Sequence, residues 1–136
     1  MANDFEVTVP VRASADAAWT LAGDPARVHE WFGPVVAVTI IGDERHAVMG
    51  NGATLVERLV DRDDDARRYS YEVVSGIPGL TSHKATIRVA ADGDACVVGW
   101  RQTATSDDPD YDIESRLGAV MTRGLEQMRE QLEAAQ

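Results

Sequence analysis

The chain contains a single cysteine, Cys96, among its 136 residues. An internal disulfide is therefore excluded, and a cytoplasmic location is the default expectation. Cys96 itself is interpreted as a small packed residue. The first residues lack the basic and apolar regions of a secretory signal, and no apolar run approaches the roughly 18 residues that span a bilayer. We therefore expect neither secretion nor membrane insertion.

Positive charge is also scarce. Lys and Arg number 13 against 23 Asp and Glu, which gives a formal net charge of −10. Nucleic acid and anionic membrane surfaces would repel such a chain. The composition therefore argues against nucleic acid as a partner.

Motifs typical of metal binding, phosphate binding and serine hydrolases are missing as well. The histidines His29, His46 and His83 do not have metal-ligand spacing, and no Gly-x-Ser-x-Gly motif occurs. Gly50-Asn51-Gly52 lacks a lysine and precedes a predicted strand, so it indicates a hairpin turn rather than a phosphate-binding loop. We expect no metal and no cofactor.

The residues that are present form a regular pattern, with 44% of them hydrophobic. The length suits one domain, residues 1–136, and no repeat or linker divides it. Alternating polarity and turn residues predict seven strands, and capping residues predict two short helices after the first strand. The predicted strands are 4–11, 35–41, 45–49, 53–62, 66–75, 81–91 and 94–105; the helices are 15–22 and about 24–32.

A long amphipathic helix is predicted from about Pro109 to Ala134, because apolar residues recur there at helical spacing. Its single apolar stripe needs a surface to cover, and an antiparallel sheet with one apolar face supplies it. The sequence therefore predicts an α+β fold in which a curved seven-stranded antiparallel sheet wraps around the long C-terminal helix.

Glu57 is the most informative single residue. It shares one face of a predicted strand with Leu55 and Leu59, where an apolar side chain is expected. A carboxylate on that face is costly unless a hydrogen bond or a polar ligand receives it. Glu57 therefore marks either an internal polar network or a binding site.

Turn positions predict how the strands pair, and with it which residues share the inner face. A three-residue loop at 63–65 places Glu57 opposite Tyr71, and a turn at 92–93 places His83 opposite Gln102. Charged residues sort to the other face, so Glu57 and His83 are the ionisable exceptions on an apolar surface. The predicted inner rows are Leu59, Tyr69, Ile87 and Val98; Glu57, Tyr71, Ala85 and Trp100; and Leu55, Val73, His83 and Gln102.

These rows predict a cavity with an apolar floor and a polar mouth. Burial disfavours a charged carboxyl group, so Glu57 could act as a general acid or base, complemented by His83 and helped by Tyr71. Alternatively these groups contact a ligand without catalysis, or they satisfy one another. The turns 50–52 and 76–80 could act as flaps. The predicted ligand contacts are Trp31, Phe32, Leu55, Tyr69, Val73, Trp100, Gln102, Leu117, Met121 and Met128.

Several short motifs follow one another in a set order along nearly the whole chain. They are Ala18-Trp19, Asp24-Pro25 before Trp31, Gly50-Asn51-Gly52 leading to Glu57-Arg58-Leu59 and Asp64, Tyr69-Ser70-Tyr71, His83-Lys84-Ala85 before Asp92-Gly93, and Trp100. With the C-terminal helix they resemble the START/Bet v 1-like (SRPBCC) superfamily, in particular its bacterial polyketide cyclase/dehydrase-like branch. A similar strand pattern occurs in plant abscisic-acid receptors, where the matching glutamate faces the ligand cavity. His83 stands where that pattern has a tyrosine.

The resemblance implies a helix-grip fold with a deep cavity between the sheet and the long helix. It implies a hydrophobic or aromatic small molecule as partner, either the substrate of a polyketide cyclase or dehydratase or the cargo of a non-catalytic carrier or sensor of a lipid, quinone or isoprenoid. A collapsed cavity would instead leave an interaction module, and sheet edges could pair in a homodimer. Fold resemblance does not choose among these functions.

Overall fold

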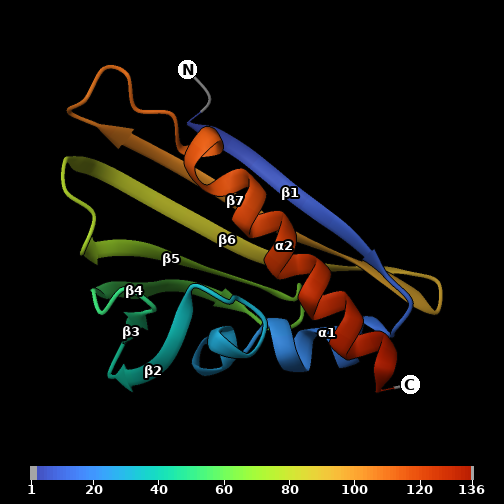
Figure 1. The fold of residues 1–136 in the computed structure, drawn as a ribbon. Coiled ribbons are helices and arrows are strands. Elements are labelled where there is room, and N and C mark those ends of the chain that lie inside the picture. The colour runs from blue at the N-terminus through green and yellow to red at the C-terminus, as the bar shows by residue number, and fades with distance from the viewer. Residues whose placement is uncertain (1–2, 136) are drawn as a thin grey trace.

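The computed structural model describes residues 3–135, which form a seven-stranded antiparallel sheet, two α-helices and a short 3-10 helix (Figure 1). The strands lie in the order β1-β7-β6-β5-β4-β3-β2. The predicted α+β helix-grip fold is confirmed. The elements are β1 (Asp4–Val11), α1 (Ala15–Ala22), η1 (Pro25–Glu30), β2 (Val35–Ile41), β3 (Glu44–Met49), β4 (Thr54–Asp63), β5 (Arg68–Ser75), β6 (Leu80–Asp92), β7 (Ala95–Ser106) and α2 (Ile113–Ala134).

The long helix α2 runs across the inner face of the sheet and contacts β1 and β7, as Figure 1 shows. Its buried stripe includes Met121, Leu125 and Met128, at the helical spacing that the sequence predicts. The helix α1 packs against β6 and β7, and η1 lies beside β2. The core therefore lies between α2 and the sheet, and the two short helices cover the other end of the same face.

The start of α2 corrects a predicted boundary. The helix begins at Ile113 rather than near Pro109, because Asp112 is its N-cap and accepts a hydrogen bond from the backbone N–H of Ser115 at 3.2 Å. The side chain of Asn3 also accepts from the N–H of Ile113 at 2.9 Å. The start of the helix is thus fixed by side chains from both ends of the chain.

The pairing of β4 with β5 and the pairing of β6 with β7 are each offset by two residues from the predicted register. Glu57 lies opposite Val73 and Leu59 opposite Tyr71, because the β4–β5 turn has four residues instead of three and a bulge follows at residues 59–61. Asp92 pairs with Ala95, so the β6–β7 turn is formed by residues 93–94 rather than 92–93. A shift of two keeps every side chain on its face, so Glu57 faces inward as predicted.

β5 and β6 separate beyond a short paired segment, and this separation shapes the site. Only residues 68–71 of β5 pair with residues 85–88 of β6. Gly76, which follows β5, has φ +112°, and a Cβ there would lie 2.8 Å from the carbonyl oxygen of Thr54. The β5–β6 connection therefore needs glycine to turn close against β4.

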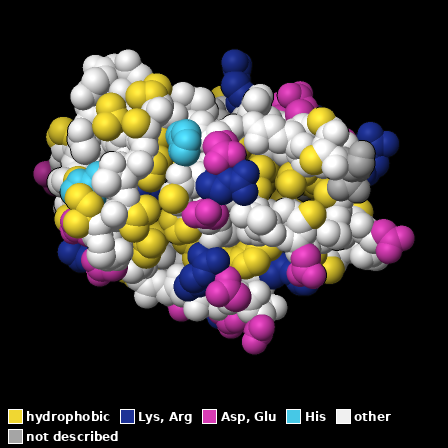
Figure 2. All heavy atoms as spheres, turned by 90° about the horizontal axis from the view of Figure 1, so that it is seen from below, with side chains coloured by type: hydrophobic (Ala, Val, Ile, Leu, Met, Phe, Trp, Pro, Cys, Tyr) yellow, Lys and Arg dark blue, Asp and Glu magenta, His cyan; other side chains and the backbone are white. Residues whose placement is uncertain are grey.

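Apolar side chains reach the surface on the face that includes β2 and the short helices. Figure 2 shows them at the β2 end of this face and also among the acidic and basic groups toward its other end. Val36, Ile40, Ile41 and Val48 of β2 and β3 are exposed. Within the described part of the chain, neither α-helix combines the length and the hydropathy needed to cross a membrane.

Candidate ligand-binding cavity

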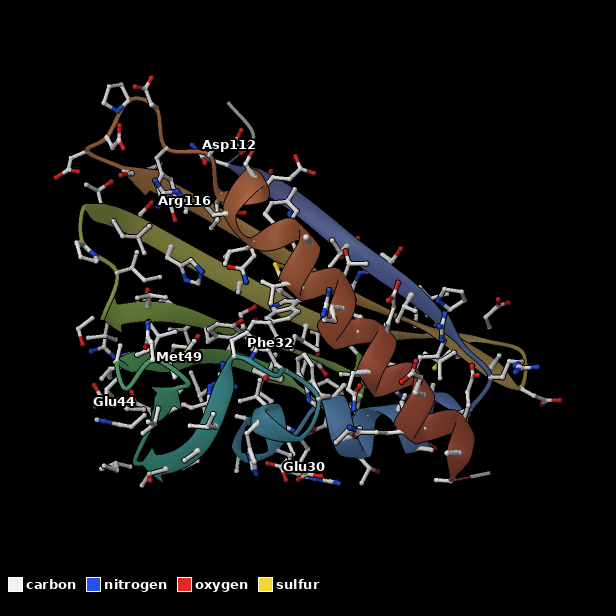
Figure 3. The ribbon with its side chains drawn as sticks, in the orientation of Figure 1. Glu30, Phe32, Glu44, Met49, Asp112 and Arg116 are labelled. Carbon is white, nitrogen blue, oxygen red and sulfur yellow. The ribbon has the colours of Figure 1, made fainter. Side chains whose placement is uncertain are left out.

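A cavity of about 280 Å³ lies between the inner face of the sheet, α2, and the turns that join β3 to β4 and β5 to β6. Most of its wall is apolar. Phe32 reaches it from the η1–β2 connection and lies beneath α2, and Met49 approaches it from the end of β3 (Figure 3). The lining consists of Phe32, Pro34, Met49, Asn51, Ala53, Thr54, Leu55, Glu57, Tyr71, Val73, Gly76, Ile77, His83, Trp100, Gln102, Leu117, Val120 and Met121.

The fold brings most of the predicted site residues into this lining. Three predicted contacts lie in the packed core instead: Trp31, Tyr69 and Met128. Trp31 packs behind Trp100 with ring centroids 5.2 Å apart, so Phe32 takes the place at the wall. Met128 lies seven residues beyond Met121 on α2, and the cavity does not extend that far. The predicted contacts that do line it are Glu57, Tyr71, His83, Phe32, Leu55, Val73, Trp100, Gln102, Leu117 and Met121.

The turns predicted as flaps also contribute to the wall. Asn51 comes from the β3–β4 turn, and Gly76 and Ile77 come from the β5–β6 connection. Sequence reasoning did not predict five other wall residues: Pro34 before β2, Met49, Ala53 and Thr54 around the β3–β4 turn, and Val120 on α2. The first four take their place from how the connections fold over the sheet edge, which strand alternation does not describe.

The most important residue that sequence reasoning missed is Arg45, on the inner face of β3 and only 2% exposed. Its Nε lies 2.9 Å from Oε1 of Glu57, which is 6% exposed. Its Nη1 donates to the carbonyl of Pro25 at 3.2 Å and to the Tyr69 hydroxyl at 3.3 Å. Glu57 is therefore one half of a buried ion pair.

The groups around Arg45 stabilise its positive charge. Burial alone would lower its pKa, but the nearby Tyr69 and Glu57 oxygens outweigh burial and raise the pKa above its ordinary value. Arg45 is thus a permanent cation, held by hydrogen bonds to three groups. Such additional hydrogen bonds are what a buried ion pair needs to offset the cost of desolvation. A signal was present in the sequence, because strand alternation puts Arg45 on the same face as the buried Ala47.

The second carboxylate oxygen of Glu57 is open to the cavity. Oε1 is bound by Arg45, whereas Oε2 has no hydrogen-bond partner among residues 3–135. The one fully enclosed side-chain polar atom without a partner in those residues is Nε1 of Trp31. Oε2 is therefore not enclosed by protein, and the space that it faces is the cavity that Glu57 lines.

His83 bridges the gap between the separated strands β5 and β6. The backbone N–H of Val73 donates to its Nδ1 at 3.0 Å, and its Nε2 lies 2.6 Å from Oε1 of Gln102. Burial lowers the pKa of His83, partly opposed by the hydrogen bond to Gln102, so the ring is neutral at pH 7. Both ring nitrogens are occupied. This geometry favours a positioning role over the predicted exchange of protons with a ligand.

Tyr71 remains a protonated phenol in the cavity wall. Its hydroxyl oxygen accepts a hydrogen bond from Nε1 of Trp100 at 3.0 Å. Burial, together with the negative charge of Glu57, raises the pKa of Tyr71 above its ordinary value, although Arg45 opposes this. The phenolic O–H remains a donor. Phe32 meets Trp100 edge to face with centroids 5.1 Å apart, which completes an aromatic wall.

Comparison with known proteins places the chain in a family. The model of the family described as polyketide cyclase / dehydrase and lipid transport matches residues 2–133. The chain belongs to this family. The predicted membership of the START/Bet v 1-like superfamily and its polyketide cyclase/dehydrase-like branch is thereby confirmed. No curated protein matches the chain.

Solved structures agree with the fold. A protein from Thermobifida fusca is 31% identical, with a TM-score of 0.78 over 96% of this chain and 93% of that one. XoxI from Bacillus cereus is 22% identical, with a TM-score of 0.88 over 97% and 96%. Norcoclaurine synthase from Thalictrum flavum, solved with dopamine and hydroxybenzaldehyde, is 20% identical, with a TM-score of 0.74 over 93% and 84%. The last two likenesses concern the fold alone.

Proposed function

We propose that this family member binds a small, mainly apolar molecule with an aromatic or similarly flat body in the cavity beneath α2. The observation that carries the proposal is a pair of polar atoms in an otherwise apolar enclosure. Oε2 of Glu57 and Nε2 of Gln102 have no hydrogen-bond partner in residues 3–135 and face the cavity. A polar atom left without a partner away from water costs about 1–3 kcal/mol, so both atoms favour a ligand or water that completes them.

The cavity's size and wall support a compact ligand. Its volume of about 280 Å³ lies just below the roughly 300–1,000 Å³ of typical small-molecule sites. Phe32, Tyr71 and Trp100 offer aromatic surface, and Met121 offers a flexible, polarisable wall. Molecules with one or two fused rings fit these features better than a long acyl chain.

Native mass spectrometry of the purified protein tests the proposal. We expect a co-purified small molecule, or uptake of small aromatic compounds from a panel, in a one-to-one complex. Leu117→Trp fills the cavity from α2 and abolishes the complex. Ala119→Trp is the matched control, because Ala119 is exposed on the same helix and outside the lining. Equal binding by both variants would place the ligand elsewhere and overturn the proposal.

Proton transfer at Glu57 is a second candidate function, as in the cyclisation or dehydration of a polyketide-like substrate. The open Oε2 supports it, because one carboxylate oxygen can reach a ligand while Arg45 holds the other. The family's description includes cyclases and dehydrases. Glu57→Gln separates the two functions: loss of turnover with affinity kept supports catalysis, and unchanged turnover rules out catalysis by Glu57. The non-catalytic alternative, a carrier or sensor of a lipid, quinone or isoprenoid, requires only the binding step.

A further inference from the structure

We infer that His83 determines which polar group the ligand carries. A chain of hydrogen bonds with a single direction runs through His83 and turns the amide NH2 of Gln102 toward the cavity. This donor selects an uncharged apolar molecule with a carbonyl-type oxygen at that end. This inference rests on the proposed binding function and adds the chemical class of the ligand.

The chain of hydrogen bonds has only one possible direction. It begins at the backbone N–H of Val73, which can donate but not accept, so Nδ1 of His83 must carry the lone pair. In a neutral imidazole the proton then sits on Nε2. Nε2–H faces the side-chain amide of Gln102 at 2.6 Å and must donate to its oxygen. A backbone group thus fixes the tautomer of a histidine, and the histidine fixes the amide.

The orientation of Gln102 follows from this direction rather than from the ordinary ambiguity of amide groups. Its oxygen points at His83, so its NH2 group points the other way. Gln102 is only 4% exposed, and its Nε2 has no hydrogen-bond partner in residues 3–135, yet this nitrogen is not enclosed by protein. It therefore opens into the cavity as a donor with no acceptor.

The separated strands explain why His83 is needed. β5 and β6 pair only as far as Tyr71 and Ala85, so the N–H of Val73 has no partner strand on the β6 side. The imidazole of His83 fills this gap and receives that N–H. This bridge keeps β5 and β6 at a fixed separation. Because the N–H of Val73 must donate to His83, His83 in turn must donate to Gln102.

The rest of the wall defines the other requirements of the ligand. Oε2 of Glu57 accepts hydrogen bonds and favours a hydroxyl or phenol group. Among residues 3–135, no Lys or Arg lines the cavity, and Arg45, which binds Glu57, is already bound to three groups. A carboxylate ligand would therefore find no free cation. The geometry favours an uncharged molecule with an oxygen acceptor near Gln102 and a donor near Glu57.

Four naphthalene compounds of nearly equal shape test this selection by isothermal titration calorimetry. 2-Ethylnaphthalene has neither polar group, 2-acetonaphthone has the acceptor, 6-ethyl-2-naphthol has the donor, and 6-hydroxy-2-acetonaphthone has both. We expect the ketones to bind about three- to tenfold more tightly than their partners without the carbonyl, which is the size of one neutral hydrogen bond. Equal affinities for all four would overturn the inference and leave the binding function standing. Absence of binding by all four counts against the proposed function.

Variants locate the effect. Gln102→Leu removes the donor, and Gln102→Glu replaces it with an acceptor; both should erase the preference for ketones, measured within each variant as the ratio of 2-acetonaphthone affinity to 2-ethylnaphthalene affinity. His83→Phe keeps a ring in the gap but breaks the chain of hydrogen bonds, and it too should reduce the ratio of ketone to hydrocarbon affinity. A purely structural role for His83 would weaken both compounds equally, and that result would overturn the positioning role.

The tautomer can be observed without a ligand. Nitrogen-15 NMR of the His83 ring in the intact protein distinguishes the Nε2–H tautomer from the Nδ1–H tautomer and from the imidazolium ion. We expect the Nε2–H tautomer at pH 7. The Nδ1–H tautomer would overturn the inference even if all four compounds bind, so its failure and that of the binding function are distinguishable.

Discussion

At the scale of single residues, the site depends on partners that strand alternation could not supply. Alternation places Glu57 and Gln102 on the inner face correctly, because a shift of register by two residues leaves faces unchanged. It does not show that Arg45 holds Glu57 or that Val73 holds His83. Those contacts depend on the pairing of β3 with β4 and on the separation of β5 from β6, which arise only in the folded sheet.

The buried ion pair gives a prediction for stability. Arg45→Met leaves Glu57 as a buried carboxylate without its cation, and we expect it to lower the free energy of unfolding by about 3–5 kcal/mol. The double variant Arg45→Met with Glu57→Leu removes both charges and should recover most of that loss. Urea denaturation of the two variants and the wild type measures this. A cost below about 1 kcal/mol for Arg45→Met would contradict the role given to the pair.

His83 gives a prediction for pH dependence. Burial places its pKa in the folded protein below the ordinary value of 6.5, so the unfolded chain takes up this proton first as the pH falls. The stability that His83 contributes is therefore complete above pH 6.5 and declines below it toward the folded pKa. The negative charges of Glu57 and Glu72 oppose the shift without reversing it.

The control is His83→Gln, which cannot titrate. Melting temperatures measured from pH 7.5 to 5 should fall more steeply in the wild type than in this variant. Parallel curves would show that His83 does not bind its proton more weakly in the folded state.

At the scale of elements, composition and spacing predicted which segments are strands and helices better than where they turn. Strand β1 and helix α1 have the predicted bounds, because alternation and the Ser14 cap mark them directly. The start of α2 was misplaced, since Pro109 also suits a first helical turn, whereas the cap formed by Asp112 decides the boundary. The register shifts came from the turns. The four-residue β4–β5 turn was predicted with three residues, and the two-residue β6–β7 turn was predicted one position too early, because neighbouring Asp and Gly residues suit either arrangement.

Two glycines of α2 give a matched test of helix packing. A Cβ at Gly118 would meet its nearest neighbours at 3.7 Å or more, whereas a Cβ at Gly124 would lie 3.0 Å from the ring of Phe32. Gly118→Ala should stabilise the protein by up to about 1 kcal/mol through helix propensity. Gly124→Ala should gain less or lose stability, and it should weaken ligand binding because Phe32 lines the cavity. Thermal melting and calorimetry measure both; an equal gain in both variants would contradict the close packing at Gly124.

At the scale of the whole molecule, the curved sheet and α2 enclose a space that the core does not fill. The single apolar helix stripe predicted the fold, and the polar residues on the inner face favoured a cavity. The sequence could not give the cavity's extent, which is why Trp31, Tyr69 and Met128 were assigned to a wall and lie in the core. The cavity's boundary depends on how turns and ring packing close it, and that is a property of the assembled structure.

Binding of a small uncharged molecule in this cavity, with its acceptor on Gln102, can be followed by NMR. The experiment is a titration of the nitrogen-15-labelled protein with 2-acetonaphthone, observed in proton–nitrogen correlation spectra. The side-chain NH2 of Gln102 and the indole N–H of Trp100 are both observable reporters. We predict saturable shifts of these two signals and of the Val73 amide, with the surface of β2 unchanged. Shifts confined to β2, or none at Gln102 while the compound binds, would contradict the account.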